Sequence, residues 1–204
     1  MVLRNKSPQA GLKAAMLLLA ALMLFSACQQ REVVWNGETE YFANLLMVED
    51  VSDPCVYVGL ADYVFVGTVE QIDRIVLPDK RKQHEDGFSS YQIRVDQNLK
   101  GNLQTHVVCS KLGGLRSDGT MLLAAAEMPD GRILPDTGLP EPGKQYIFLA
   151  YAQQDGSLTL SELFDNRICS EALIEEYTDY VEHAVPNERQ RFPSNYDAGA
   201  ENEN

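Results

Sequence analysis

The pattern of hydrophobic and polar positions predicts short β-strands along most of the chain. The densest signal is residues 63–72, which are rich in β-branched and aromatic side chains and begin with apolar residues on both alternating faces. Such a strand is buried on both sides or curves through a barrel, and Gly67 in its middle predicts a bulge or a sharp bend. Residues 91–99 alternate cleanly, as in a strand half-buried on an antiparallel sheet. The side chains predicted to share their buried face are Tyr91, Ile93, Val95 and Leu99.

Further strands follow from the same pattern. Residues 103–112 and 145–152 have strand character, and Asp155-Gly156 gives the strongest hairpin signal in the chain, with residues 158–161 returning. Residues 121–127 have no sharp period, so they stay open between strand and helix. The apolar segment before residue 51 predicts a short helix or strand, and we interpret Trp35, the only tryptophan, as a core anchor in preference to a ligand platform.

Two helices are predicted. Asp53-Pro54 opens a short helical turn through Leu60, because proline is tolerated where its missing N–H is no loss. Ser170 is a good N-cap for an amphipathic helix ended by Pro186. The residues that form its apolar face are Leu173, Ile174, Tyr177, Tyr180 and Val181.

These elements predict a mainly β protein, an OB-like barrel of five to six antiparallel strands with a C-terminal amphipathic helix. We expect the barrel domain with its terminal helix to span residues 51–185. A tether and N-terminal segment (28–50) precede it, and a disordered acidic tail (186–204) follows it.

The N-terminal residues have the order of a secretory signal peptide. A segment with Arg4, Lys6 and Lys13 precedes an apolar run from residue 14 to 25, which is too short to span a bilayer. The sequence Leu-Phe-Ser-Ala-Cys at residues 24–28 resembles a bacterial lipobox, in which cleavage precedes the cysteine and its thiol takes a diacylglycerol. Phe25 disfavours the ordinary signal peptidase. Residues 1–27 are therefore interpreted as a lipoprotein signal peptide and Cys28 as the lipidated N-terminus, with simple secretion or an uncleaved anchor as the alternatives.

This signal peptide predicts an extracytoplasmic protein, anchored by lipid to the cell membrane, or to the outer membrane in a Gram-negative cell. The mature chain would carry 14 basic and 30 acidic residues, a formal net charge of −16. Such a balance argues against nucleic acid as a partner, because phosphates demand a basic surface.

No arrangement of residues predicts catalysis, a metal or a cofactor. The histidines, His84, His106 and His183, lie far apart and lack ligand-like spacing to one another or to cysteine. His106 and Cys109 lie three residues apart on one strand, so their side chains would point to opposite faces. The carboxylates that could pair across strands are Asp62, Glu70 and Asp96, although solvated strand ends are far commoner.

One family resemblance covers about residues 50–183. The run Ala-Asp-Tyr-Val-Phe-Val-Gly-Thr-Val at 61–69, the strand 91–99 with Lys100-Gly101, the run 142–149 and a last hairpin leading to Cys169 are similar to the netrin-type module shared with tissue inhibitors of metalloproteinases. The resemblance implies an OB-fold barrel. The activity is not carried over, because those inhibitors use a free N-terminal cysteine and Cys28 would be lipidated.

The cysteines that remain beside Cys28 permit one internal bridge, which can persist outside the cytoplasm. We predict a Cys55–Cys169 disulfide, since both residues lie at element ends and the netrin-type module ties its N-terminal segment to the region after its last strand. Cys109, in mid-strand beside Val107, is predicted to be free and buried.

The function predicted from the sequence is a non-catalytic binding module for an envelope protein, peptide or glycan. A cell-envelope enzyme and a protease-inhibitor-like module remain the alternatives. The candidate binding loop is residues 73–90, because OB barrels bind ligands beside the loop between strands one and two. The basic residues gathered there are Arg74, Lys80, Arg81 and Lys82. A mobile, solvated loop without a partner is the competing interpretation.

Overall fold

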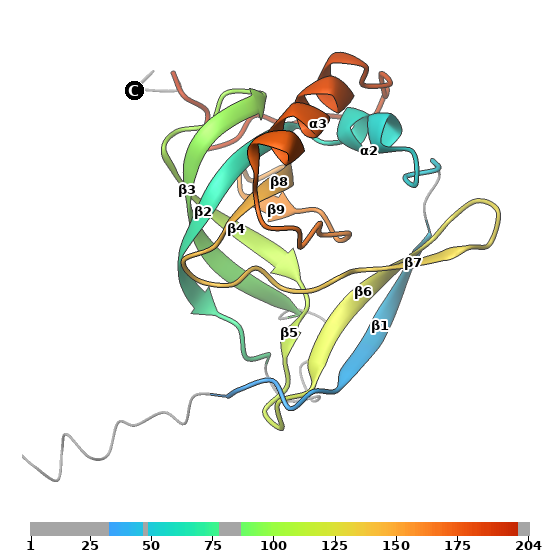
Figure 1. Ribbon diagram of the computed structural model, residues 1–204, viewed down its shortest axis with the longest axis vertical. Helices are drawn as coiled ribbons and strands as arrows, with labels where there is room; N and C mark the ends of the chain where they lie inside the picture. Colours follow the sequence, from blue (N-terminus) through green and yellow to red (C-terminus); the bar gives the residue numbers. More distant parts are fainter. Residues whose placement is uncertain (1–32, 47–48, 78–86, 200–204) are drawn as a thin grey trace, which may run out of the picture. The chain divides into compact units, whose positions relative to one another are not determined.

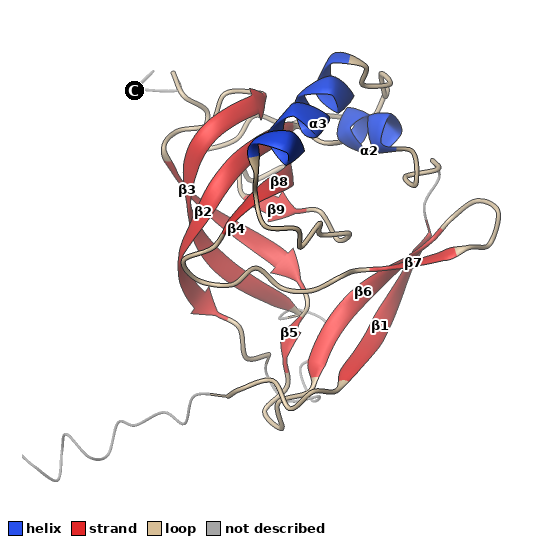
Figure 2. Ribbon diagram, viewed as in Figure 1, coloured by secondary structure: helices blue, strands red, loops and turns tan. Residues whose placement is uncertain are grey.

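Five strands close into a barrel in the computed structural model of the chain, which describes residues 33–46, 49–77 and 87–199 (Figures 1 and 2). The strands are β2 (Tyr63–Arg74), β3 (Phe88–Lys100), β4 (His106–Leu112), β8 (Gln145–Ala152) and β9 (Leu158–Leu160). They are hydrogen-bonded in the order β2-β3-β4-β9-β8, and β8 pairs with β2 to complete the circle. The predicted OB-like barrel is therefore confirmed, with one difference: the β4–β9 pair that closes it is parallel.

Gly67 lies where β2 bends, as predicted. The register of β2 with β3 shifts between Val66 and Gly67. A Cβ atom on Gly67 would lie 2.6 Å from the Cγ2 atom of Ile93 and 3.2 Å from the ring of Phe148, so any side chain here would collide with the barrel core. The strand therefore coils tightly because glycine leaves room for the side chains of the two neighbouring strands, β3 and β8.

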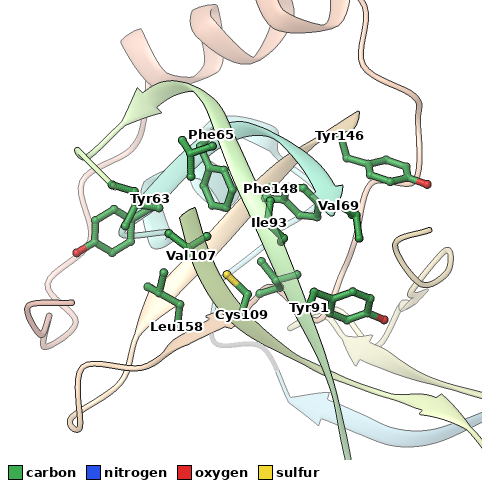
Figure 3. Packing of buried hydrophobic residues seen from close by; sticks show 14 of the residues in the cluster. Tyr63, Phe65, Val69, Tyr91, Ile93, Val107, Cys109, Tyr146, Phe148 and Leu158 are labelled. Atoms are coloured by element: carbon green, nitrogen blue, oxygen red, sulfur yellow. The ribbon is translucent and has the colours of Figure 1, made fainter. Parts of the chain in front are cut away.

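The barrel interior is filled by the side chains that alternate inward on every strand (Figure 3). The rings of Phe65 and Phe148 lie 5.4 Å apart between centroids, and Phe148 stacks on Phe164 at 5.7 Å. Cys109 is fully buried in this core, which confirms its predicted position. Burial of this extent is the main favourable contribution to folding.

Leu99 does not share the buried face of Tyr91, Ile93 and Val95, and the prediction is wrong at this residue. The β2–β3 register skips Asp96 and Leu99, so β3 contains two extra residues. Each extra residue reverses the alternation of the residues that follow it. Leu99 therefore packs on the outer side of the barrel, against the cluster beneath the helices.

A second sheet is formed by the insertion between β4 and β8 together with one strand that precedes the barrel strands. Its strands are β1 (Thr39–Leu46), β5 (Gly114–Leu115), β6 (Met121–Glu127) and β7 (Ile133–Pro135). Residues 121–127, left open by the sequence, form its central strand, with β1 parallel along one edge and β5 and β7 on the other. The segment before residue 51 is thus a strand, and it joins the insertion, not the barrel.

Two helices cover part of the outer side of the barrel. The predicted helices are confirmed as α2 (Pro54–Leu60), capped by Asp53, and α3 (Glu171–Glu182), capped by Ser170. Leu173 and Tyr177 of α3 pack with Val58 of α2 over the outward side chains of β2 and β8. Those outward side chains are Val64, Val66, Ile147 and Leu149.

The C-terminal end of α2 is capped by three cations from elsewhere in the chain. Lys100 Nζ donates to the carbonyls of Val58 and Gly59 at 2.8 and 3.2 Å. Arg189 donates to Leu60 O, and Arg191 donates to Gly59 O and Ala61 O. Positive charge at this end of a helix satisfies the last carbonyls and complements the dipole.

The segment after α3 is ordered as far as residue 199, so the prediction of a disordered tail is wrong for residues 186–199. Both arginines of this segment form ion pairs with the carboxylate of Asp62, with Arg189 at 2.5 Å and Arg191 at 2.7 Å. Farther along, Tyr63 Oη donates to Asp197 Oδ1 at 2.6 Å. The composition of the tail is polar, but its polar groups have specific partners on the barrel.

The predicted Cys55–Cys169 disulfide is wrong. The N–H of Val185 donates to Cys55 O at 3.1 Å, which places Cys55 beside the residues that follow α3. Cys169 precedes α3 and its N–H bonds Gln145 O. The 12 residues of α3 rise roughly 18 Å, and a disulfide requires Cα atoms within about 7 Å. Both cysteines are free thiols, and the prediction that Cys109 is free is confirmed.

Candidate binding face on the barrel exterior

The outer side of the barrel is open to solvent where the helices end. On β2 the outward residue changes from buried Val66 to partly exposed Thr68, and on the neighbouring β8 it changes from Ile147 to Gln145. Registered pairs then continue this polar row across β3 and β4. The row that crosses the four strands is Gln145, Thr68, Arg94 and His106. We call this surface, with Glu70, Gln71, Asp73, Gln92, Asp96 and Val108, the open face.

Asp96 is the centre of the hydrogen-bond network on the open face. Its carboxylate accepts from Thr68 Oγ1 at 2.6 Å and from Gln145 Nε2 at 2.8 Å, and it lies 3.0 Å from Arg94 Nη2. Asp96 is one of the two extra residues of β3. Bulges re-aim side chains in this way, and here the carboxylate meets partners from three strands.

A second carboxylate on the open face has two amide partners. Asp73 Oδ1 accepts from Gln71 Nε2 and from Gln92 Nε2, both at 2.8 Å. His106 Nε2 lies 3.7 Å from Glu70 Oε2, and Val108 is 41% exposed beside them on β4. The face thus combines amides, carboxylates and a guanidinium, which proteins use to hydrogen-bond polar ligands, with one exposed apolar side chain on β4.

A shallow groove continues the face past His106. It has a volume of about 550 Å³ and is lined by Gln104, Thr105, His106, Ala198 and Gly199. The β4 side of the groove belongs to the barrel, whereas the other side belongs to the ordered C-terminal segment. A ligand that lies along the polar row would therefore find a continuing surface at this end.

The side chains considered for catalysis are kept apart. Cys109 points into the core, where burial raises the pKa of its thiol well above the ordinary value, whereas His106 is exposed on the outer side. The three carboxylates considered for acid–base chemistry have separate partners: Asp62 bonds the tail arginines, Glu70 lies near His106, and Asp96 bonds Arg94. No group of three side chains able to hold a metal ion occurs within the described ranges.

A buried ion pair is the other conspicuous polar cluster. Lys111 Nζ lies 2.5 Å from Asp136 Oδ2, and both side chains are fully buried. The ammonium also donates to Glu162 O, and Asp136 Oδ1 accepts from the N–H of Phe164. Burial lowers the pKa of Lys111 and raises that of Asp136, each toward its neutral form. This pair ties β4 to the β7–β8 connection and has no route to solvent.

Of the four basic residues of the predicted binding loop, the structure describes only Arg74. It ends β2, opposite Ser90 of β3, and its Nε atom donates to Phe88 O at 3.0 Å. Arg74 therefore lies on the strands that form the open face. Lys80, Arg81, Lys82 and Cys28 lie outside the described residues.

Sequence reasoning passed over the open face because its pattern was read as ordinary solvent exposure. The outward side chains of residues 91–99 were identified, but the bulge that makes Asp96 the centre of the network gives no sequence signal. Lys111, by contrast, falls in phase with Val107 and Cys109 on β4. That phase was a usable signal for a buried charge.

Comparisons with known proteins supply no identity for the chain. No protein-family model matches it, and no curated protein matches it at a significant level. In the described part of the chain no helix is long and apolar enough to cross a membrane.

Proposed function

We propose that the protein is a lipid-anchored extracytoplasmic lipoprotein whose barrel serves as a non-catalytic binding module. The lipobox-like sequence ending at Cys28 supports the anchor, and the open face supports the binding role. One observation carries the binding role. Four adjacent strands present a hydrogen-bonding row to solvent, and two helices cover the neighbouring part of the same barrel wall.

The chemistry of the open face favours a peptide or a glycan as the ligand. Its amides and carboxylates bond one another in the free protein, and a polar ligand can replace these bonds one by one. The strongly acidic composition of the chain opposes polyanions. The groups are spread across an exposed sheet, an arrangement that suits recognition along an extended ligand.

A site-specific photo-crosslinker tests the binding role in cells. Placed at Val108, on β4 at one side of the open face, it is expected to give a discrete crosslinked adduct on gels. The matched control is the same group at Ile168, an apolar residue that is 54% exposed on the segment before α3. An adduct from both positions, or from Ile168 alone, would move the binding site away from the open face.

The anchor is tested independently by mass spectrometry of the native protein. A peptide that begins at Cys28 and carries a diacylglycerol-sized addition is expected. An unmodified N-terminus elsewhere contradicts the lipoprotein assignment and leaves the binding role to be judged on the crosslinking result.

A further inference from the structure

Two apolar side chains are displayed together at the N-terminal start of the described chain. Val34 is 71% exposed and Trp35 is 50% exposed, in a segment that leads into β1 and is neither helix nor strand. The interpretation of Trp35 as a core anchor is therefore wrong. A half-exposed indole next to an exposed valine is an arrangement that water disfavours.

The segment that displays them is held in place. Trp35 Nε1 donates to Glu38 O at 2.7 Å, and the N–H of Asn36 donates to Gly119 O at 3.0 Å. Gly119 has a φ of 90°, and a Cβ atom on it would lie 2.5 Å from the carbonyl oxygen of Val34. The 116–120 turn can approach this closely only because residue 119 is glycine. The exposed position of Val34 and Trp35 is thus fixed by the fold.

Val34 and Trp35 lie at the end of the described unit that is opposite to the helices. The carbonyl of Glu38 accepts from Met121 at the start of β6, whereas Ala126 and Met128 at the other end pack with Val51 and Tyr57 near α2. Figure 1 shows the same arrangement, with the segment that leads into β1 far from α2 and α3. This pair of side chains is therefore clear of the covered part of the barrel.

We infer that Val34 and Trp35 insert into the headgroup region of the membrane that holds Cys28. The inference rests on the proposed lipid anchor. Trp35 follows Cys28 by seven residues, a chain length that reaches at most about 25 Å. Lipidation would therefore keep the indole within reach of the bilayer surface, where tryptophan is favoured because its ring is apolar and its N–H is polar.

The surrounding charges select the kind of lipid. Glu38 and Glu40 follow in the chain, and Asp118 lies in the neighbouring turn together with Arg116, which pairs with Glu40. Carboxylates are repelled by the negative surface potential of anionic lipids. The occupant that fits is a zwitterionic lipid surface, contacted by shallow insertion.

Because Trp35 is the only tryptophan, its fluorescence reports the contact directly. The lipidated protein is reconstituted into phosphatidylcholine vesicles, with and without lipids brominated near the headgroup end of the acyl chains. The expected result is a blue-shifted emission and a loss of emission with the brominated lipids. Emission that stays unshifted and unquenched overturns the inference. A blue shift that appears without vesicles and grows with protein concentration also overturns it, because a second copy would then cover the tryptophan.

Matched variants separate insertion from simple proximity. Val34→Glu is expected to reduce the quenching, whereas Val108→Glu, which changes a valine on the open face, should leave it unchanged. Equal quenching in both variants contradicts insertion by Val34. The mass of the Cys28 peptide is measured in the same preparation. Lipidated but unquenched protein overturns the membrane contact alone, and an unmodified Cys28 overturns the contact together with the anchor.

Discussion

The two polar clusters of the barrel each pair a basic side chain with an aspartate, but in opposite settings. The Lys111–Asp136 pair is sealed between β4 and the β7–β8 connection, whereas the Arg94–Asp96 pair lies on the open face, with Arg94 47% exposed. A buried ion pair is held by the surrounding structure and destabilises the fold when one partner is lost. An exposed pair contributes little to stability and can exchange its partners. The contrast assigns the buried cluster to folding and the exposed cluster to binding.

The largest expected effect comes from breaking the buried pair. Lys111→Met leaves the carboxylate of Asp136 enclosed without its cation, and we expect the free energy of unfolding to fall by about 3–5 kcal/mol. Urea denaturation measures this loss. Adding Asp136→Asn, which removes the charge and keeps an acceptor for the N–H of Phe164, should recover part of it. A double variant no more stable than Lys111→Met would show that the two charges are not coupled.

Lys100 is intermediate between the buried Lys111 and the exposed Arg94, and its titration makes its contribution to stability depend on pH. Its ammonium is half-buried against the end of α2, and desolvation together with nearby Arg191 lowers its pKa to about 8. The unfolded chain, in which this lysine keeps its ordinary pKa of 10.5, then binds more protons between pH 8 and 10.5. The contribution of Lys100 to the free energy of unfolding should therefore rise with pH through this window, whereas the Cys109 thiol, whose pKa is raised by burial, contributes a change of opposite sign.

Urea denaturation of the unchanged protein and of Lys100→Met at several pH values up to about 9.5, below the ordinary tyrosine pKa of ~10, measures this contribution as the difference between the two free energies of unfolding. The difference, unchanged protein minus variant, should increase with pH. The control is Lys144→Met, because a hydrogen bond and ion pair with Glu141 raise the pKa of Lys144 and place its titration above the window. A difference that stays constant with pH for Lys100→Met, as is expected for Lys144→Met, would contradict the assignment of this titration to Lys100.

Local patterning predicted the barrel strands and both helices well, because each depends on residues near in sequence. The strand 63–72, the hairpin at Asp155-Gly156 and the cap at Ser170 all follow this rule. Features that depend on distant partners were missed. The clearest cases are the second sheet, where β1 pairs with residues about 80 positions away, and the ordered tail, whose arginines meet Asp62.

The candidate site shows the same division. The outward alternation of β3 was visible in the sequence. The network around Asp96, however, depends on the bulges of β3, which no residue type predicts. The Cys55–Cys169 prediction failed because both cysteines were placed at element ends without regard to which end of α3 each adjoins. The distance between Cys55 and Cys169 could be predicted only after α3 had been placed.

The smallest expected effect on stability, and the sharpest on binding, comes from Arg94→Ala. Arg94 joins Asp96 and Thr68 on an exposed strand, so we expect the free energy of unfolding to change by no more than about 0.5 kcal/mol. The crosslinked adduct from Val108 should nevertheless weaken, because the ligand loses the guanidinium of the polar row. Arg132→Ala is the matched control: Arg132 is 50% exposed and also pairs with an exposed carboxylate, but it lies at the β6–β7 turn and not on the open face. The control should keep the full adduct. An adduct that survives Arg94→Ala unchanged would leave Arg94 as a surface ion pair only, and the comparison between the two clusters would then rest on Asp96 and its glutamine partner.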